Sequence, residues 1–370
     1  MTALHLISSG GYYGVENMLA GLLGSMKRLG CRPVLAVYRN SLNPHLEVEE
    51  AARNQGVETT IIPCQGRCDW AAVNRTLRSI RDTGASIVHS HGYKADLYGY
   101  LATRIVRRSL VATCHNWTGE SAPMRAYERL DRLLLRRFDR IAAVSENVRT
   151  HLNGAGVAAR KVTVIGNGVD VERLAAAETT LRNELPPGRC IIGSVGRLVA
   201  AKGFDILIRC VPDILKRFPQ AFLVIAGEGP DRDRLSGIIR ELSLEKHVRL
   251  VGARDDMPGV YRSLDLFVLP SLNEGMPMVV LEAMAAGLPI VATAVGAIPA
   301  MLKAPHAGCV VSPGNGDELA EAISGLLAKP KLASAMGKNA EVLARAAFSI
   351  DAVARNYLQM YDGLLLEYAG

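Results

Sequence analysis

Residues 265–285 read DLFVLPSLNEGMPMVVLEAMA and contain the pattern that decides the fold. Asp265 to Leu269 predict a short buried strand, and a loop that contains a glycine follows it. Pro277 is suited to the first turn of a helix, and the residues after it are apolar on nearly every side. A buried strand, a loop and a buried helix in this order are typical of a parallel sheet with helices on both faces.

The same alternation of short apolar runs and longer amphipathic segments extends along the whole chain. Further strands are expected at 4–9, 34–38, 59–62, 86–89, 110–114 and 141–144, and then at 191–195, 222–226, 248–251 and 290–293. This pattern predicts the α/β class with two Rossmann-like, doubly wound domains in tandem. Ligands of such folds bind at the carboxyl ends of the strands, so we expect a site in a cleft between the two sheets.

The domain boundaries follow from the point, after residue 170, where the alternation of strand and helix patterns begins again. Residues 1–170 are expected to form the N-terminal domain, and the polar residues 171–188, which include two prolines, are expected to form a linker. Residues 189–349 are expected to form the C-terminal domain. The amphipathic pattern of residues 350–370 predicts a long helix that packs back on the N-terminal domain.

The composition excludes several classes of protein. Hydrophobic residues make up 49% and charged residues 21% of the 370 residues, which is typical of a globular chain and not of a disordered one. The seven scattered cysteines indicate reduced thiols and a cytoplasmic location, and the close pair Cys64 and Cys68 lacks the second pair that a zinc site needs. We expect neither a signal peptide nor a membrane-spanning segment.

The net charge of +7 arises partly from basic residues clustered on two expected helices, namely Arg104, Arg107, Arg108, Arg129, Arg132, Arg136, Arg137 and Arg140. Two interpretations stay open: solvated helix faces, or a surface that docks on anionic lipid headgroups or an acidic acceptor. No RNA- or DNA-binding motif accompanies the charge, so nucleic acid is not an expected partner.

Glu282 and Glu274 are the first candidate binding residues. Glu282 lies inside the expected buried helix, where an ionised carboxylate needs a fixed partner. That partner is either a neighbouring arginine or amide, or a pair of ligand hydroxyls such as those of a ribose. Glu274 lies one loop earlier and is placed to meet further hydroxyls. The amides of Gly275 and Met276 at the start of the helix are suited to phosphate.

A second candidate motif, GSVGRLVAAKG, spans residues 193–203 after an expected strand. Arg197 and Lys202 on this loop suit a diphosphate, although a surface loop with ordinary charges is the alternative. Gly227 opens a tight turn, Gly-Glu-Gly-Pro, that is expected to line the cleft. Asp231 and Asp233 after this turn favour helix capping over metal binding.

In the first domain, the glycine turn at residues 10–14 lacks the spacing of a dinucleotide fingerprint. It is suited to a close approach of substrate to the backbone. His115 stands just beyond the strand 110–114, at the expected cleft edge, and is a functional candidate. His89 and His91 flank the end of the preceding strand, where histidines are often structural.

With these motifs, the chain resembles glycosyltransferase family 4, whose members are retaining enzymes with the GT-B fold. The resemblance covers essentially the whole chain and is strongest between Gly193 and Pro299. It is carried by Glu274-x7-Glu282, preceded in order by Gly196-Arg197, Lys202-Gly203 and Gly227-Glu228-Gly229.

The resemblance implies a retaining glycosyltransferase of the hexosyltransferase type that uses a nucleoside-diphosphate sugar. The acceptor would be a glycan or a lipid-linked intermediate in the synthesis of cell-surface polysaccharide, lipopolysaccharide or glycolipid. No cofactor and no metal ion are expected. The N-terminal domain would bind the acceptor and the C-terminal domain the donor, with the enzyme peripheral at the inner face of the cell membrane.

The resemblance also implies roles for single residues. His115, Glu274, Arg197 and Lys202 would be catalytic. The donor site would consist of Gly11, Gly196, Arg197, Lys202, Gly227, Arg254, Glu274, Gly275, Met276, Pro277 and Glu282. Glu282 would bind the ribose, Glu274 the sugar hydroxyls, and residues near Arg254 the base. Met276 departs from the family pattern, which usually has a bulky aromatic residue at this position.

Three alternative functions stay open. The first is another GT-B enzyme, such as a nucleotide-sugar epimerase or a glycogen-type phosphorylase. The second is a nicotinamide-dependent dehydrogenase, which the missing fingerprint disfavours. The third is a non-catalytic nucleotide-sugar binder. The donor base, uridine or guanosine, is also open.

Overall fold

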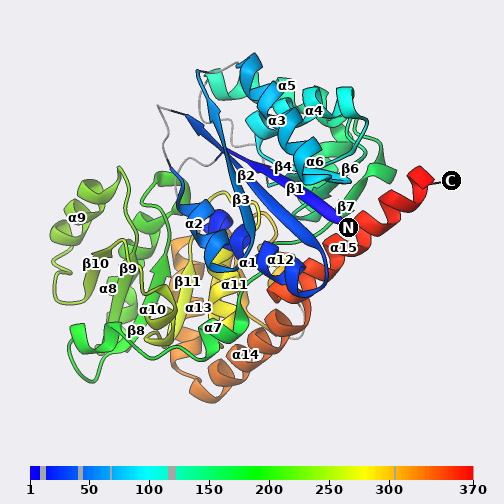
Figure 1. The fold of residues 1–370 in the computed structure, drawn as a ribbon. Helices are drawn as coiled ribbons and strands as arrows, with labels where there is room; N and C mark the ends of the chain where they lie inside the picture. The colour runs from blue at the N-terminus through cyan, green and yellow to red at the C-terminus, as the bar shows by residue number, and fades with distance from the viewer. Residues whose placement is uncertain (9–13, 41–44, 67–68, 116–121, 304–305, 370) are drawn as a thin grey trace. The chain divides into compact units, whose positions relative to one another are not determined.

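The apolar runs of the sequence form two parallel sheets, one in each of two compact units (Figure 1). The first unit consists of residues 1–168 together with 350–370, and the second of residues 169–349. The computed structural model describes residues 1–8, 14–40, 45–66, 69–115, 122–303 and 306–369.

The first sheet has seven parallel strands in the order β3-β2-β1-β4-β5-β6-β7. Its strands are β1 (Thr2–Ile7), β2 (Arg32–Asn40), β3 (Glu58–Cys64), β4 (Ile87–His91), β5 (Ser109–Cys114), β6 (Arg140–Ala143) and β7 (Val162–Val164). The strand order reverses direction between β1 and β4, as in a doubly wound sheet. All six residues of β5 are buried, which is typical of a parallel strand covered on both faces.

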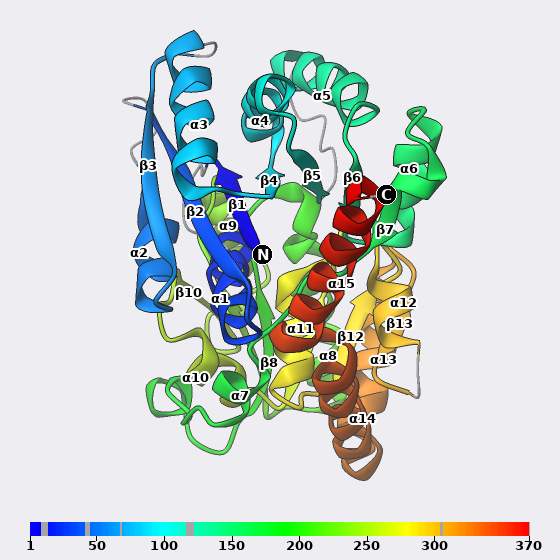
Figure 2. The same ribbon diagram turned by 45° about the vertical axis from the view of Figure 1, so that its right-hand side comes forward.

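The helices of this unit are α1 (Gly14–Arg28), α2 (Glu47–Asn54), α3 (Trp70–Thr83), α4 (Tyr93–Val106), α5 (Ala122–Leu135), α6 (Glu146–Gly154) and α15 (Ile350–Ala369), with a short 3-10 turn, η1 (Ala159–Lys161). Helix α15 packs against α1 (Figure 2). The hydroxyl of Ser25 on α1 donates to Asp351 on α15 at 2.5 Å. The last helix of the chain therefore belongs to the first unit.

The second sheet has six parallel strands in the order β10-β9-β8-β11-β12-β13. They are β8 (Cys190–Val195), β9 (Ala221–Ala226), β10 (Val248–Gly252), β11 (Leu266–Leu269), β12 (Ile290–Thr293) and β13 (Cys309–Val311). Leu223, Ile225 and Val268 from these strands pack against apolar residues of three helices, α8 (Phe204–Arg217), α9 (Arg232–Glu241) and α13 (Gly316–Leu327).

The remaining elements of the second unit are α7 (Val171–Ala175), η2 (Leu181–Glu184), η3 (Ala200–Lys202), α10 (Met257–Arg262), α11 (Met278–Ala285), α12 (Ile298–Leu302), α14 (Pro330–Leu343) and the π-helix η4 (Ala344–Phe348). Helix α11 packs against α7, α10 and α14. Residues 171–188, where the sequence analysis expects a linker, bury Val171, Leu174, Leu181 and Leu185 within this unit.

The predicted α/β class with two doubly wound parallel sheets is confirmed. The strands β7 and β13 are absent from those expected from the sequence, because each has only three residues, which is too short for a periodic pattern. Pro277 is the residue before the first turn of α11 and not a residue within it. Among the described residues, no helix combines the length and the apolar character that crossing a bilayer requires.

Candidate donor site

The candidate site is built from loops that follow the carboxyl ends of the strands in the second sheet. Backbone hydrogen bonds join the loops after β8 and β9: the N–H of Leu198 donates to the carbonyl of Glu228 at 2.8 Å. The loops after β9 and β10 are joined by the N–H of Gly227, which donates to Gly252 at 2.8 Å. Gly227 has φ +140°, and a Cβ there would lie 1.9 Å from the carbonyl oxygen of Gly196. The close approach of these two loops therefore requires glycine at 227.

The loop after β11 is joined to η3 in the same way. The N–H of Leu272 donates to the carbonyl of Ala201 at 2.8 Å. Gly203 has φ +64°, and a Cβ on this residue would lie 2.2 Å from the carbonyl oxygen of Pro270. On the other side, the N–H of Ala297 donates to Gly275 at 2.8 Å. These bonds fix the motif 193–203 beside the loop that carries Glu274.

Lys202 and Glu274 meet at the centre of this loop cluster. The Nζ of Lys202 lies 2.5 Å from Oε1 of Glu274, and the hydroxyl of Ser271 donates to the same oxygen at 2.7 Å. The side chains are only 20% and 10% exposed, respectively. Two residues that the sequence places 72 positions apart are therefore in contact, and the structure brings a cation and a carboxylate together on these loops. Arg197 is exposed on the same loop.

Glu282 has a hydrogen-bond partner that its sequence context does not predict. The hydroxyl of Tyr261 on α10 donates to Oε2 of Glu282 on α11 at 2.6 Å, and Tyr261 is completely buried. Burial raises the pKa of Glu282, while the hydrogen bond from Tyr261 and the charge of Arg173 act in the opposite direction. Burial, together with the adjacent Glu282, also raises the pKa of Tyr261 well above its ordinary value.

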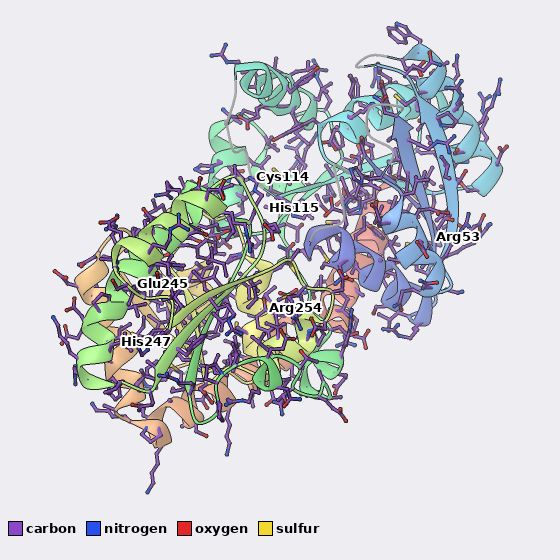
Figure 3. All side chains as sticks on the ribbon, turned by 90° about the vertical axis from the view of Figure 1, so that its left-hand side faces the viewer. Arg53, Cys114, His115, Glu245, His247 and Arg254 are labelled. Atoms are coloured by element: carbon purple, nitrogen blue, oxygen red, sulfur yellow. The ribbon has the colours of Figure 1, made fainter. Side chains whose placement is uncertain are left out.

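Arg254 is held by two carboxylates at the loop after β10 (Figure 3). Its guanidinium donates to Glu184 at 2.8 and 3.0 Å and to both carboxylate oxygens of Asp256 at 2.8 Å. The hydrogen bonds from Arg254 lower the pKa of Asp256 to about 2. Its side chain is 20% exposed, so contact with a base would involve the face of the guanidinium or its neighbours.

Of the predicted residues near α11, Met276 and Pro277 are buried, while Gly275 and Gly196 are partly exposed. These four residues, like Lys202 and Gly227, lie on the loops that the backbone hydrogen bonds described above join together. Gly11 lies outside the described residues, and its predicted contact with the diphosphate stays a prediction.

His115 belongs to the first unit and follows Cys114 at the end of β5 (Figure 3). Its Nδ1 is buried and has no hydrogen-bond partner among the described residues. Burial lowers the pKa of His115 to about 4, so the imidazole is neutral at pH 7. A buried neutral imidazole with an open nitrogen can hydrogen-bond a ligand without carrying a charge.

Three further histidines, His5, His89 and His91, form the group among the described residues whose spacing could hold a metal ion. The rings of His89 and His91 are stacked with centroids 4.4 Å apart, and Nδ1 of His5 lies 3.1 Å from Nε2 of His91. Both nitrogens of His89 are hydrogen-bonded, one to the hydroxyl of Tyr361 and the other to Thr113 at 2.8 Å. A metal ligand needs a free lone pair, so His89 would have to give up one of these bonds. The group instead ties α15 to the sheet.

The two parallel, doubly wound sheets, one in each unit, are the architecture expected of the GT-B fold. Among solved structures, the chain is similar to Alr3699/HepE from Anabaena in complex with UDP, with a TM-score of 0.85, 22% identity, and coverage of 98% of this chain and 100% of that one. It is also similar to sucrose-phosphate synthase from Thermosynechococcus elongatus, with a TM-score of 0.80, 20% identity, and coverage of 99% of both chains. The GT-B fold expected from the sequence is confirmed.

Residues 12–173 match the family described as Glycosyltransferase Family 4, and residues 177–342 match Glycosyl transferases group 1. A lipopolysaccharide core biosynthesis mannosyltransferase, LpcC of Rhizobium leguminosarum, is 31% identical over 253 residues, which are 66% of this chain and 70% of that protein. A D-inositol 3-phosphate glycosyltransferase of Corynebacterium jeikeium is 29% identical over 311 residues, covering 77% and 74%. The chain therefore belongs to glycosyltransferase family 4, as the motifs indicate.

Proposed function

We propose that this glycosyltransferase transfers a hexose, with retention, from a nucleoside-diphosphate sugar to an acceptor hydroxyl. The observation that carries the proposal is the contact of Lys202 with Glu274 beside the start of α11. The ammonium group of Lys202 and the carboxylate of Glu274 pair with each other in the structure. A bound donor would replace this contact. Its diphosphate would pair with the ammonium group of Lys202, and its sugar hydroxyls would donate hydrogen bonds to the carboxylate of Glu274.

The proposed chemistry breaks the bond between the anomeric carbon and the diphosphate oxygen. Negative charge then grows on the leaving diphosphate, and Arg197, Lys202 and the amides of Gly275 and Met276 are assigned to stabilise it. Since these groups supply positive charge directly, the proposal includes no metal ion and no cofactor. Glu282 would accept hydrogen bonds from the ribose.

For retention, the acceptor oxygen would bond to the face of the sugar that the diphosphate leaves. The acceptor hydroxyl proton would pass to the departing phosphate oxygen, so that no protein base is required. His115, which is neutral at pH 7 because its pKa is lowered to about 4, would hydrogen-bond the donor sugar near the reacting carbon. His115 thus has a positioning role that does not depend on its charge.

The donor is proposed to be a UDP-sugar, with a GDP-sugar as the alternative. The similar Anabaena protein binds UDP-glucose in its solved structure, while one mycobacterial relative is named as GDP-mannose-dependent. A thermal-shift panel of nucleotide sugars would decide between them, because a ligand that binds the folded state alone raises the unfolding temperature. A larger shift with GDP-sugars than with UDP-sugars would overturn the uridine assignment.

The acceptor is proposed to be a glycan or lipid-linked intermediate of cell-surface polysaccharide, lipopolysaccharide or glycolipid synthesis. The relatives' names, which include lipopolysaccharide core and phosphatidylinositol mannoside synthesis, support this proposal. We place the enzyme in the cytoplasm, peripheral at the inner face of the cell membrane. The exposed basic residues of α5 support that placement.

The decisive experiment follows nucleoside diphosphate release with and without acceptor. A transferase releases the diphosphate in an acceptor-dependent manner and forms a product with the donor's anomeric configuration, which NMR resolves. An epimerase would convert the donor without an acceptor, and a non-catalytic binder would release nothing. A product with inverted configuration would overturn the retaining assignment alone.

A further inference from the structure

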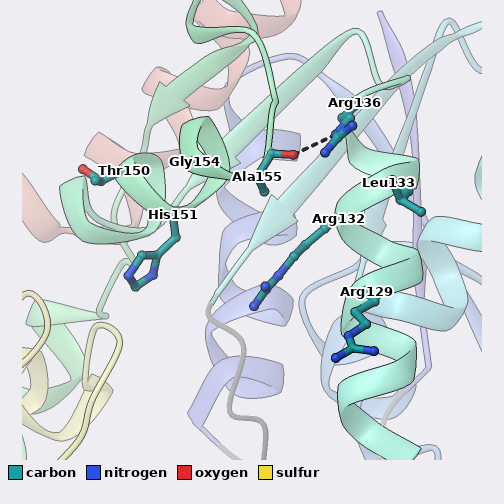
Figure 4. Close-up of a pocket in the computed structure, with 8 residues that line it drawn as sticks. All are labelled: Arg129, Arg132, Leu133, Arg136, Thr150, His151, Gly154 and Ala155. Carbon is teal, nitrogen blue, oxygen red and sulfur yellow. Dashed lines mark hydrogen bonds between the residues drawn. The ribbon is translucent and has the colours of Figure 1, made fainter.

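A cationic cleft lies in the first unit between α5 and α6 (Figure 4). It has a volume of about 630 Å³, and its walls include Arg129 and Arg132 of α5, Arg136 directly after this helix, and His151 of α6. Arg132 extends from α5 toward α6 (Figure 4), and His151 of α6 also lines the cleft. Among the described residues, none of those that line the cleft is acidic.

Helix α5 separates its charges between two faces. Arg129 and Arg132 are exposed and have the i, i+3 spacing of one helix face, and the exposed Arg136 lies in the turn directly after the helix. The acidic residues Glu128 and Asp131 of the same helix are buried, with 5% and 4% exposure. The acidic side chains therefore face the interior, while the outer surface of the helix is positive.

The wall of the cleft is held in place by its own hydrogen bonds. Nε of Arg136 donates to the carbonyl of Ala155, directly after α6, at 2.7 Å. Arg129 has no ion pair within the described part of the chain and is exposed. Arg136 thus joins the ends of the two helices, and Arg129 is available to an anion.

Apolar side chains form a second exposed stripe on α5. Tyr127, Leu130 and Leu133 are 37%, 44% and 55% exposed, and they are spaced by three residues beside the arginines. Single exposed leucines are common on protein surfaces. A helix with adjacent basic and apolar exposed stripes, however, is typical of helices that lie in the interface of a membrane.

We propose that the cleft between α5 and α6 binds the phosphate groups of anionic phospholipids, while Leu130 and Leu133 enter the headgroup boundary. Guanidinium groups pair with phosphate in a bidentate geometry, which suits the three arginines. A soluble phosphate would use the arginines but would leave the exposed leucines without a role, so the lipid is the favoured source of the phosphate. The inference rests on the proposed attachment to a membrane and assigns that attachment to a site, and it is independent of the donor site.

The test measures binding of the full chain to vesicles by flotation, without any nucleotide sugar. The vesicles contain phosphatidylcholine alone or phosphatidylcholine with phosphatidylglycerol. We expect binding to the anionic vesicles only, and Arg129→Gln with Arg136→Gln should weaken it about 30-fold, at roughly fivefold for each arginine near the surface. The matched control, Arg78→Gln with Arg81→Gln, removes two exposed arginines from α3 of the same unit. It should weaken binding by less than about threefold, because charges remote from the lipid contact are screened.

A second variant separates the lipid from a soluble phosphate. Leu130→Gln with Leu133→Gln keeps the charge and should weaken vesicle binding at least about tenfold. Thermal unfolding of the leucine variant and of the α3 control should match that of the parent chain, since these side chains are exposed. Arg136→Gln also removes the hydrogen bond to Ala155, so the arginine variant should unfold at a slightly lower temperature, and its binding is measured where it remains folded. Vesicle binding that withstands the leucine changes but is displaced by millimolar inorganic phosphate would overturn the lipid assignment.

Two other results would also overturn the inference. If Arg129→Gln with Arg136→Gln weakens vesicle binding no more than the α3 control does, the assigned site is wrong, but the attachment to membranes is still supported. If the parent chain ignores anionic vesicles, both the site and the attachment are wrong. Neither result bears on sugar transfer, which is measured separately with a soluble acceptor.

Discussion

Removal of the Tyr261 hydroxyl tests the assignment of Glu282 as a ribose ligand. In Tyr261→Phe the carboxylate of Glu282 loses the hydrogen bond that the structure places at 2.6 Å, and the ring remains in its fully buried position. A hydrogen bond to a charged group contributes about 1.5–3 kcal/mol to stability. We expect the variant to fold with a free energy of unfolding that is lower by about this amount at pH 7.

The destabilisation should depend on pH in a defined direction. Burial already raises the pKa of Glu282 above its value in the unfolded chain, and loss of the Tyr261 donor raises it further. The cost of the buried charge is absent below the unfolded pKa, where both states are protonated, and it is complete above the folded pKa. The variant should therefore be closer to the parent chain at pH 4 than at pH 7, as measured by urea unfolding.

The same change should weaken donor binding with little effect on turnover. A carboxylate that has lost its orienting hydrogen bond accepts ribose hydrogen bonds poorly, so KM for the donor should rise about tenfold, equivalent to about 1.4 kcal/mol. The control is Tyr38→Phe, which removes a hydrogen bond between two neutral hydroxyls, Tyr38 and Thr76, at 2.8 Å in the first unit. A pH-independent loss of stability in Tyr261→Phe, together with an unchanged KM, would refute the reasoning.

Three further predictions concern the donor-site loops and the histidine group. Arg197→Ala or Lys202→Ala should each lower kcat by on the order of a hundredfold or more, as the loss of a charge-stabilising donor does. Arg240→Ala on α9, an exposed control in the same unit, should leave kcat unchanged. Near-normal turnover in both loop variants would contradict the charge-stabilising role. Gly227→Ala should lower the free energy of unfolding by more than about 1 kcal/mol, because its Cβ would collide with the carbonyl oxygen of Gly196. The same change should weaken donor binding in a titration. An unchanged melting temperature would argue against the close contact. Burial lowers the pKa of His5 to about 3, so stability should decline as the pH falls from about 6.5 to about 3, since the unfolded chain takes up a proton there and the folded chain does not. His5→Asn should remove about 1.4 kcal/mol per pH unit of that slope in urea unfolding series, and an identical slope in the variant would show that other groups control the acid limb.

Strands with strong local signals could be predicted from the sequence. Runs such as residues 222–226 and 110–114 are apolar throughout, because a strand in the middle of a parallel sheet is buried on both faces. The edge strands β7 and β13 are three residues long, and their pairing depends on neighbours that are distant in the sequence. A sequence window that short carries no period, so only the folded sheet reveals them.

Some features of the candidate site could likewise be predicted from the sequence, and others could not. The loop residues Lys202 and Glu274 could be located from the sequence, because each follows a recognisable strand and the carboxyl ends of parallel strands share one edge of the sheet. Their contact at 2.5 Å, and the engagement of Arg254 by Glu184 and Asp256, depend on how separate loops pack.

The sequence by itself determined the α/β class, the family and the identity of the candidate donor residues, since these follow from periodicity and motif order. Only the tertiary structure decided that Tyr261 is the partner of Glu282, that the tyrosines of α15 hydrogen-bond to His89 and Thr113, and that α5 buries its acids and exposes its arginines. The physical reason is that the burial and the charge state of a side chain depend on what covers it. In these cases the covering residues come from distant parts of the chain.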